Sequence, residues 1–200
     1  MGKRSAAKTG LFPYFMVSMV LFALFVPLGT LVHELFHLFS ALVLGCKAIL
    51  LKSSIDYSNC TQLTGNCKAI GEDSICYNDF LIYLAGPLGT LIISLTGLVL
   101  LKYLSKTSFL ENLWVVLSLF HLRVTANAGI GLLSGDYQLS TDERIISSYL
   151  GVNQTVATIL VHTISLLILL SLFQTLGFKR SLFYFFSGLA GFIAGYFLFF

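Results

Sequence analysis

Long apolar runs separated by short polar stretches dominate the pattern along this chain. Five runs each reach the ~20 residues that a helix rising ~1.5 Å per residue needs to cross ~30 Å of hydrocarbon. They cover residues 11–46, 80–101, 112–133, 155–178 and 181–200. Helices are the expected form, because unpaired backbone groups are costly in lipid and no alternating barrel pattern is visible. The pattern predicts an all-α fold, a polytopic membrane helix bundle of about five to six spans.

The first run can be divided in two ways. It follows a basic stretch, as the apolar part of a signal peptide does, but it continues for about 35 residues, well past the ~7–15 of a signal sequence. Pro27 and Gly29 lie inside it and predict a kink or a break. The run therefore crosses the membrane once, or turns near these residues and crosses twice.

Composition supports a multi-pass integral membrane protein and excludes other classes. Of the 200 residues, 56% are hydrophobic and 10% are charged, whereas about a quarter of the residues in a soluble domain are charged. The mean hydropathy is +0.88. A formal net charge of +3, without a long Lys/Arg block, gives no support for nucleic-acid binding. The expected environment is the lipid bilayer, with no nucleic acid among the partners.

Charge alone does not orient the chain. If the first run crosses once, seven basic residues lie on one side of the membrane and four on the other. The richer side would be cytoplasmic by the positive-inside rule. If the run crosses twice, the count is the same and the sides are reversed, so both arrangements stay open.

The cysteines favour the single crossing. All four fall within or at the edge of the loop 47–79, and their spacing differs from that of a zinc site, which has pairs about two to four residues apart. They are Cys46, Cys60, Cys67 and Cys76. Such a set suits disulfides in an oxidising compartment, with three possible pairings, although four free thiols facing the cytosol is the alternative. Glycosylation-type triplets at 59–61 and 153–155 likewise favour placing the loops 47–79 and 134–154 outside the cytosol.

The motif H-E-x-x-H occupies residues 33–37, within the first run. Helix residues four apart share a face, so His33 and His37 can bind one metal ion at about 2.0–2.1 Å. Glu34 projects beside the metal and can act on its water. A carboxylate in an apolar helix costs a few kcal/mol and must face a partner or a cavity. The motif predicts a zinc site; the structural alternative is a polar cluster that hydrogen-bonds neighbouring spans.

A catalytic zinc site usually has three protein ligands and leaves a fourth position for water. Candidates for the third ligand are Asp136, Asp142, Glu143, His121 and His162. Asp136 ends the third run, and that end shares a membrane side with the motif histidines in either arrangement. His121 precedes Asp136 by fifteen residues, roughly 22 Å along a helix, and is expected to be out of reach. We predict Asp136, with Gly135 allowing a close backbone approach.

Residues from about 28 to 140 resemble the site-2 protease family of intramembrane zinc metalloproteases. The motif at 33–37, the Gly86-Pro87 pair in the intervening run, and the segment 127–136 occur in the family's order. The resemblance implies a site-2-protease-like core with Glu34 as the catalytic residue and one zinc ion per chain on the ligands already named. It also implies that Asn127, Gly86 and Pro87 contact the substrate. The family's usual site lies nearer the cytosolic side, whereas a single crossing of the first run places this one nearer the outer side.

These patterns together predict the organisation and the activity. Residues 1–10 form a basic tail, 11–140 a catalytic membrane core, and 141–200 the C-terminal spans. The expected function is that of a zinc metalloendopeptidase, hydrolysing a peptide bond in or near a transmembrane segment of a membrane-protein substrate. The alternatives are a non-proteolytic metal-binding or transport protein, and an inactive relative that binds membrane clients. A transporter would show further intramembrane carboxylates, and none besides Glu34 lies deep in a run.

Two features of the last runs bear on packing. Gly188, Gly191 and Gly195 form a small-residue face suited to close helix contact. This face predicts packing within the bundle or, as the alternative, a homo-oligomer seam through Gly191 and Gly195. His162 is expected to hydrogen-bond to a neighbouring span.

Overall fold

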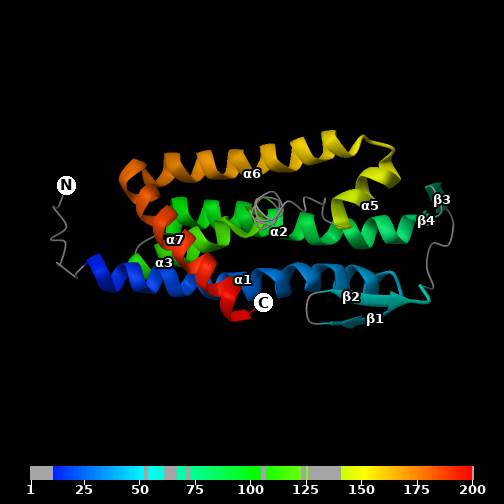
Figure 1. Ribbon diagram of the computed structural model, residues 1–200, viewed down its shortest axis with the longest axis horizontal. Helices are drawn as coiled ribbons and strands as arrows, with labels where there is room; N and C mark the ends of the chain where they lie inside the picture. Colours follow the sequence, from blue (N-terminus) through cyan, green and yellow to red (C-terminus); the bar gives the residue numbers. More distant parts are fainter. Residues whose placement is uncertain are drawn as a thin grey trace.

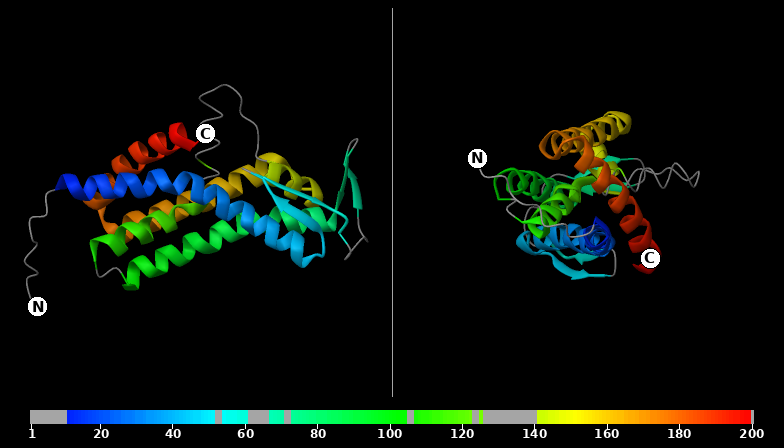
Figure 2. Two further views of the ribbon diagram at one scale, coloured as in Figure 1. Left: turned by 90° about the horizontal axis from the view of Figure 1, so that it is seen from below. Right: turned by 90° about the vertical axis from the view of Figure 1, so that its left-hand side faces the viewer.

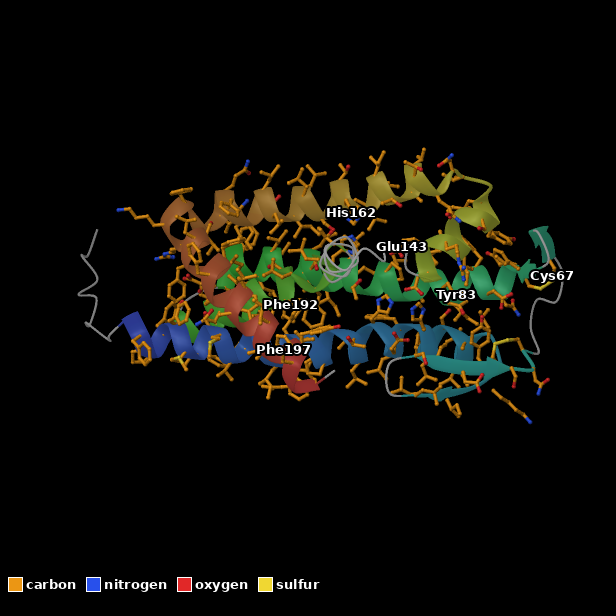
Figure 3. All side chains as sticks on the ribbon, viewed as in Figure 1. Cys67, Tyr83, Glu143, His162, Phe192 and Phe197 are labelled. Carbon is orange, nitrogen blue, oxygen red and sulfur yellow. A yellow bond between two sulfur atoms is a disulfide. The ribbon has the colours of Figure 1, made fainter. Side chains whose placement is uncertain are left out.

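The computed structural model of this chain is mostly helical and describes residues 11–51, 54–60, 67–70, 73–104, 107–122, 125 and 141–199. Among these residues, four helices are long and apolar enough to cross a membrane. They are α1 (Leu11–Val43), α2 (Tyr77–Leu104), α6 (Gln154–Leu176) and α7 (Phe178–Phe199). Large apolar side chains cover their outer surfaces (Figure 3), and Phe197, for example, is 82% exposed. The predicted bundle of long apolar helices is confirmed.

The bundle has two distinct ends (Figure 1). One holds the last residue of α1, the first residue of α2 and two small β-hairpins, and we call it the disulfide end. The other holds the start of α1, the end of α2 and the start of α7, and we call it the basic end. A short helix, α5 (Thr141–Leu150), packs against α2 toward the disulfide end.

The first predicted run forms one continuous helix, as the single-crossing alternative requires. α1 has 33 residues and passes through Pro27 without a break. Because proline lacks an N–H, the Ala23 carbonyl loses its partner within the helix. The backbone of α7 lies directly against this carbonyl, since a Cβ added at Gly195 would collide with the Ala23 oxygen.

The third predicted run is wrong as a single helix over 112–133. The helix α3 (Ser108–Ser118) ends at its last residue and is followed by a 3-10 turn, η1 (Phe120–Leu122). The backbone N–H of His121 donates to Ser94 Oγ of α2 at 2.7 Å. This side-chain acceptor lets the helix end inside the bundle with its backbone paired. The described residues therefore contain four spanning helices rather than five to six.

The loop 47–79 contains strands that the all-α prediction omitted. β1 (Lys47–Leu50) pairs antiparallel with β2 (Ile55–Ser58), and β3 (Cys67–Ile70) pairs antiparallel with β4 (Asp73–Cys76). Disulfides join Cys46 to Cys60 and Cys67 to Cys76. Each disulfide closes one hairpin, which selects one of the three possible pairings. The prediction of disulfides in this loop agrees with the structure.

The small-residue face of α7 is used within the chain. Figures 1 and 2 both show α7 lying across the first half of α1. A Cβ at Gly191 would collide with the Met19 oxygen and lie 2.6 Å from the Cβ of Phe22. Of the two alternatives for this face, the structure contains the packing within the bundle. On α6, His162 Nδ1 lies 3.1 Å from Thr125 Oγ1, as expected for a hydrogen bond between segments (Figure 3).

Candidate metal centre

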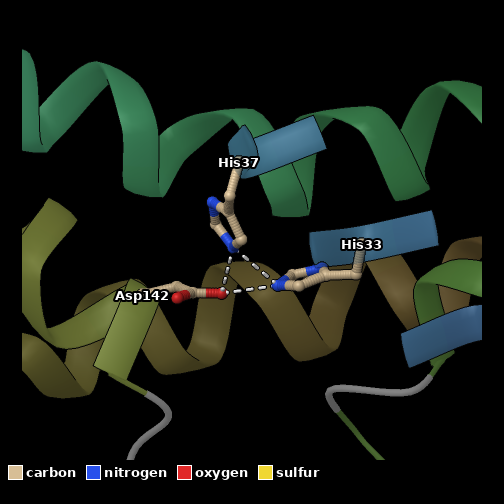
Figure 4. Close-up of side chains that lie close together, drawn as sticks. All are labelled: His33, His37 and Asp142. Atoms are coloured by element: carbon tan, nitrogen blue, oxygen red, sulfur yellow. Dashed lines mark hydrogen bonds and ion pairs between the residues drawn. The ribbon is translucent and has the colours of Figure 1, made fainter. Parts of the chain in front are cut away.

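Three side chains converge between α1, α2 and α5 (Figure 4). His33 Nε2 lies 2.7 Å from Asp142 Oδ2 and 3.0 Å from His37 Nε2. His37 Nε2 lies 3.4 Å from the same carboxylate oxygen. Among the described residues, His33, His37 and Asp142 are the group of metal-binding side chains whose ligand atoms all lie within 4.8 Å of one another.

The helical spacing of the motif places both histidines on the inner face of α1. His33 and His37 are 4% and 3% exposed, whereas Leu35 and Phe39, on the other side of the helix, are 43% and 67% exposed. This contrast follows from the period of 3.6 residues per turn. The polar stripe of α1 therefore faces the bundle and its apolar stripe faces outward.

A backbone carbonyl of α2 orients the second histidine. His37 Nδ1 lies 2.6 Å from the Ile82 oxygen. A carbonyl oxygen only accepts hydrogen bonds, so Nδ1 of a neutral His37 carries the proton and Nε2 keeps a lone pair. That lone pair faces His33 and Asp142. A hydrogen bond to the second ring nitrogen is the usual support of a metal-bound histidine, so Ile82 holds His37 in the tautomer that can bind a metal ion.

Gly86 leaves the space that the imidazoles occupy. It lies one turn after Ile82 on α2, and a Cβ added there would collide with His37 Nε2 and lie 2.8 Å from His33 Cε1. A side chain on this face would push both rings out of position. The site therefore requires glycine at position 86 for a close approach between backbone and side chain.

Asp142 reaches the site because α5 folds back against α2. The ring of Tyr149 on α5 stacks on that of Phe80 on α2, with centroids 4.7 Å apart. Asp142 lies in the first turn of α5, next to the buried Glu143. Burial raises the pKa of the Asp142 carboxyl, but the imidazoles of His33 and His37 beside it outweigh this effect and hold the pKa well below its usual range. The carboxyl is therefore ionised, as a metal ligand must be.

The donor set and its spacing fit a zinc ion. Two imidazole nitrogens and one carboxylate oxygen are common zinc ligands, and in a tetrahedral site such donors lie roughly 3.3–3.5 Å from one another. The separations here run from 2.7 to 3.4 Å. Outward shifts of a few tenths of an ångström bring all three donors to the required spacing.

Glu34 lies next to this group on α1. It is 8% exposed and lies close enough to His37 for the two side chains to interact electrostatically. A buried carboxylate beside three convergent donors is positioned to exchange protons with a molecule bound among them.

Some of the site residues predicted from the sequence lie at the candidate metal centre and others do not. His33, Glu34 and His37 lie at the site, and Gly86 packs against the two histidines. Pro87 lies within α2, where its carbonyl accepts from Thr90 Oγ1 at 2.9 Å. Asp136 and Asn127 lie outside the described residues, so the ligand role of the first and the substrate contact of the second stay predictions.

The sequence offers Asp142 as a candidate third ligand, and topology favours Asp136 over it; the structure places Asp142 in the first turn of α5. Asp142 also belongs to the segment 141–200, which the sequence predicts to hold the C-terminal spans. A signal for α5 was present, since Thr141 is followed by two acidic residues, as at the start of many helices. Comparisons with protein-family models, with curated proteins and with solved structures gave no match to this chain.

Proposed function

We propose that this chain is an intramembrane zinc metalloprotease that hydrolyses a peptide bond in or near a transmembrane segment of another membrane protein. One observation carries the proposal: two histidines of an H-E-x-x-H motif and an aspartate from a distant helix converge in a buried site, with the motif glutamate beside them. The group lies between α1, α2 and α5, in a chain with four apolar helices of spanning length among its described residues. The substrates expected from this location are membrane proteins.

In this proposal His33, His37 and Asp142 hold the zinc ion. Bound zinc would supply Lewis-acid chemistry, which makes water more acidic and a peptide carbonyl more electrophilic. Ile82 keeps His37 in the ligating tautomer through its carbonyl. Gly86 keeps the backbone of α2 clear of both rings. Each of these contacts orients a ligand before any substrate arrives.

Glu34 is the general base and then the general acid. Its carboxylate accepts a proton from the attacking water and later donates it to the amine that leaves as the peptide C–N bond breaks. This role needs a carboxylate close to the reacting water, and the burial of Glu34 on α1, next in sequence to His33, supports it. Water is added across the bond, so no further reactant is needed.

The test joins metal analysis to a cleavage assay on the full chain. Parent protein, Glu34→Gln and His33→Ala are reconstituted with single-span membrane proteins that carry a different tag at each end. We expect about one zinc per chain and chelator-sensitive cleavage in the parent. Glu34→Gln should keep the zinc and lose cleavage, while His33→Ala should lose both. Cleavage by Glu34→Gln at the parent's rate would refute the mechanism. Zinc binding without cleavage of any substrate would favour a non-proteolytic metal site.

A further inference from the structure

The metal centre lies much closer to one end of the bundle than to the other. His37 is six positions before Val43, the last residue of α1, which is about 9 Å along the helix. His33 is 22 positions after Leu11, the first residue of α1, or about 33 Å. On α2 the supporting carbonyl of Ile82 is five positions after the first residue. Both helices therefore place the site near the disulfide end.

The two disulfides at the disulfide end indicate an oxidising compartment. Cys46 follows the last residue of α1 by three positions and is bonded to Cys60. Cys76 directly precedes α2 and is bonded to Cys67. Disulfides persist outside the cytosol and are rare within it. This end is therefore expected to face away from the cytosol.

The Lys and Arg residues of the basic end independently support the same orientation. Lys102 lies in the last turn of α2, and Lys179 and Arg180 lie in the first turn of α7. In the sequence, the basic residues 3, 4 and 8 precede α1 and residue 106 follows α2. Seven of the twelve Lys and Arg residues thus lie in or next to the segments of this end, against four for the disulfide end. Because α1 crosses once, the count now has a single interpretation: the basic end is cytoplasmic.

We infer that the metal centre opens toward the extracytosolic face, and that its substrates are single-span membrane proteins cut near the extracytosolic end of their span. The substrate class rests on the proposed protease activity. A substrate helix must unwind before a peptide bond can be attacked, and every backbone group unpaired in lipid costs several kcal/mol. A site about 9 Å from the helix end requires only the nearer end of a substrate span to unwind. Hydrolysis there releases the extracytosolic part of the substrate outward.

The accessibility of the metal is tested first, without any substrate. Full-length protein loaded with zinc is reconstituted into sealed vesicles, and its orientation is measured by labelling the cysteines with an impermeant maleimide after impermeant reduction. EDTA is then added outside the vesicles and the retained zinc is measured. We expect zinc loss from molecules whose disulfide end faces outward, at least tenfold faster than from molecules in the opposite orientation. Faster loss when the basic end faces outward would overturn the inference.

The orientation in cells and the substrate class are tested separately. In cells, the cysteine-bearing loop should be labelled only from the extracytosolic side, and labelling from the cytosol would overturn the inference.

Two tagged single-span substrates then differ only in whether a helix-destabilising segment lies near the extracytosolic or the cytosolic end of the span. We expect the first to be cleaved about tenfold faster or more, because less backbone must unwind in lipid. Preference for the second would overturn the inference while leaving the protease activity intact. Cleavage of neither would refute the protease activity and the substrate class together, and the zinc measurement would still report the side on which the site opens.

Discussion

The two ends of this molecule are held together by different forces. At the basic end, apolar side chains from six helical segments form one buried cluster. Its members are Phe22, Phe25, Leu101, Val115, Val116, Phe120, Leu172 and Tyr184. At the disulfide end the buried apolar cluster has only four members, Ala41, Leu44, Cys46 and Ile82, and the structure relies on disulfides and polar contacts. The larger core therefore lies away from the metal centre.

Polar contacts at the basic end pair helices without creating a site. Ser18 Oγ lies 2.8 Å from Ser187 Oγ, and Tyr14 Oη lies 2.7 Å from Tyr184 Oη, both linking α1 to α7. Such hydroxyl pairs satisfy each other inside a membrane bundle. None of these side chains is a strong metal ligand, so this end is suited to packing.

Polar contacts at the disulfide end support the metal centre. Tyr57 of β2 donates to Asp79 Oδ1 at 2.9 Å, and the Cys76 N–H donates to Asp79 Oδ2 at 2.8 Å. The first hairpin packs against the buried cluster that includes Ile82, whose carbonyl contacts His37. We therefore expect substitutions at the two ends to have different effects. Changes near the disulfide end should alter metal affinity, and changes near the basic end should alter stability.

The largest expected effect on metal affinity comes from Asp142→Asn. An amide lacks the negative charge of the carboxylate, and loss of a direct ligand should exceed the ~10–100-fold cost of losing a supporting contact. We expect zinc affinity to fall by more than 100-fold, measured by competition with a chromophoric chelator. Asp56→Asn, on the exposed face of β2, is the matched control and should change little. Asp136→Asn is measured in parallel, and a larger loss there than at Asp142 would return the third ligand to Asp136.

The second-largest expected loss of zinc affinity comes from Gly86→Ala. The added methyl group must displace the rings of both ligating histidines, so we expect a loss near the upper end of the ~10–100-fold range for supporting contacts. Gly89→Ala is the control, because its Cβ would meet the Phe36 ring one turn further along α2, where no metal ligand is touched. Both variants should lose stability, measured by thermal unfolding in detergent. Equal zinc affinity in the two would contradict the role assigned to Gly86.

The difference between the ends also explains what could be predicted from the sequence. Long apolar helices can be predicted from the sequence, because each must carry enough apolar residues to cross the bilayer. The observed helices α1, α2, α6 and α7 follow four of the five predicted apolar runs closely. The two motif histidines are four residues apart on one helix, so local geometry alone brings His33 and His37 together. These features depend on residues close in the sequence.

The third ligand depends on tertiary structure instead. Asp142 enters the site only because α5 stacks Tyr149 on Phe80 and so returns toward α2. Nothing in the ten residues of α5 specifies that contact by itself. Likewise, the end of α3 at Ser118 depends on Ser94 of a different helix accepting the His121 N–H. A run of apolar residues cannot show where a neighbouring side chain will replace a backbone hydrogen bond.

A smaller effect is expected from removing one disulfide. Cys46→Ser with Cys60→Ser frees the hairpin that packs against the buried cluster containing Ile82. We therefore expect zinc affinity to fall about tenfold, the lower end of the range for supporting contacts. Cys67→Ser with Cys76→Ser frees the second hairpin and should change affinity less than twofold. Both pairs close short loops, and either removal should cost about 3 kcal/mol of stability. The same loss of affinity in both double variants would show that the first hairpin has no special connection to the site.

The smallest effect on metal affinity should come from substitutions toward the basic end of the bundle. Gly191→Ala places a methyl group against the backbone of α1. The new Cβ would collide with the Met19 oxygen, and such overpacking typically costs about 1–3 kcal/mol. Gly188→Ala, on the same face of α7, would place its Cβ 3.3 Å from the Phe22 ring, where a small ring movement can accommodate it. We therefore expect a clear fall in the unfolding temperature for Gly191→Ala, a slight one for Gly188→Ala, and zinc affinity within twofold of the parent for both. A large loss of zinc affinity in Gly191→Ala would mean that strain at α1 and α7 reaches the histidines along α1, and that the two ends are mechanically coupled.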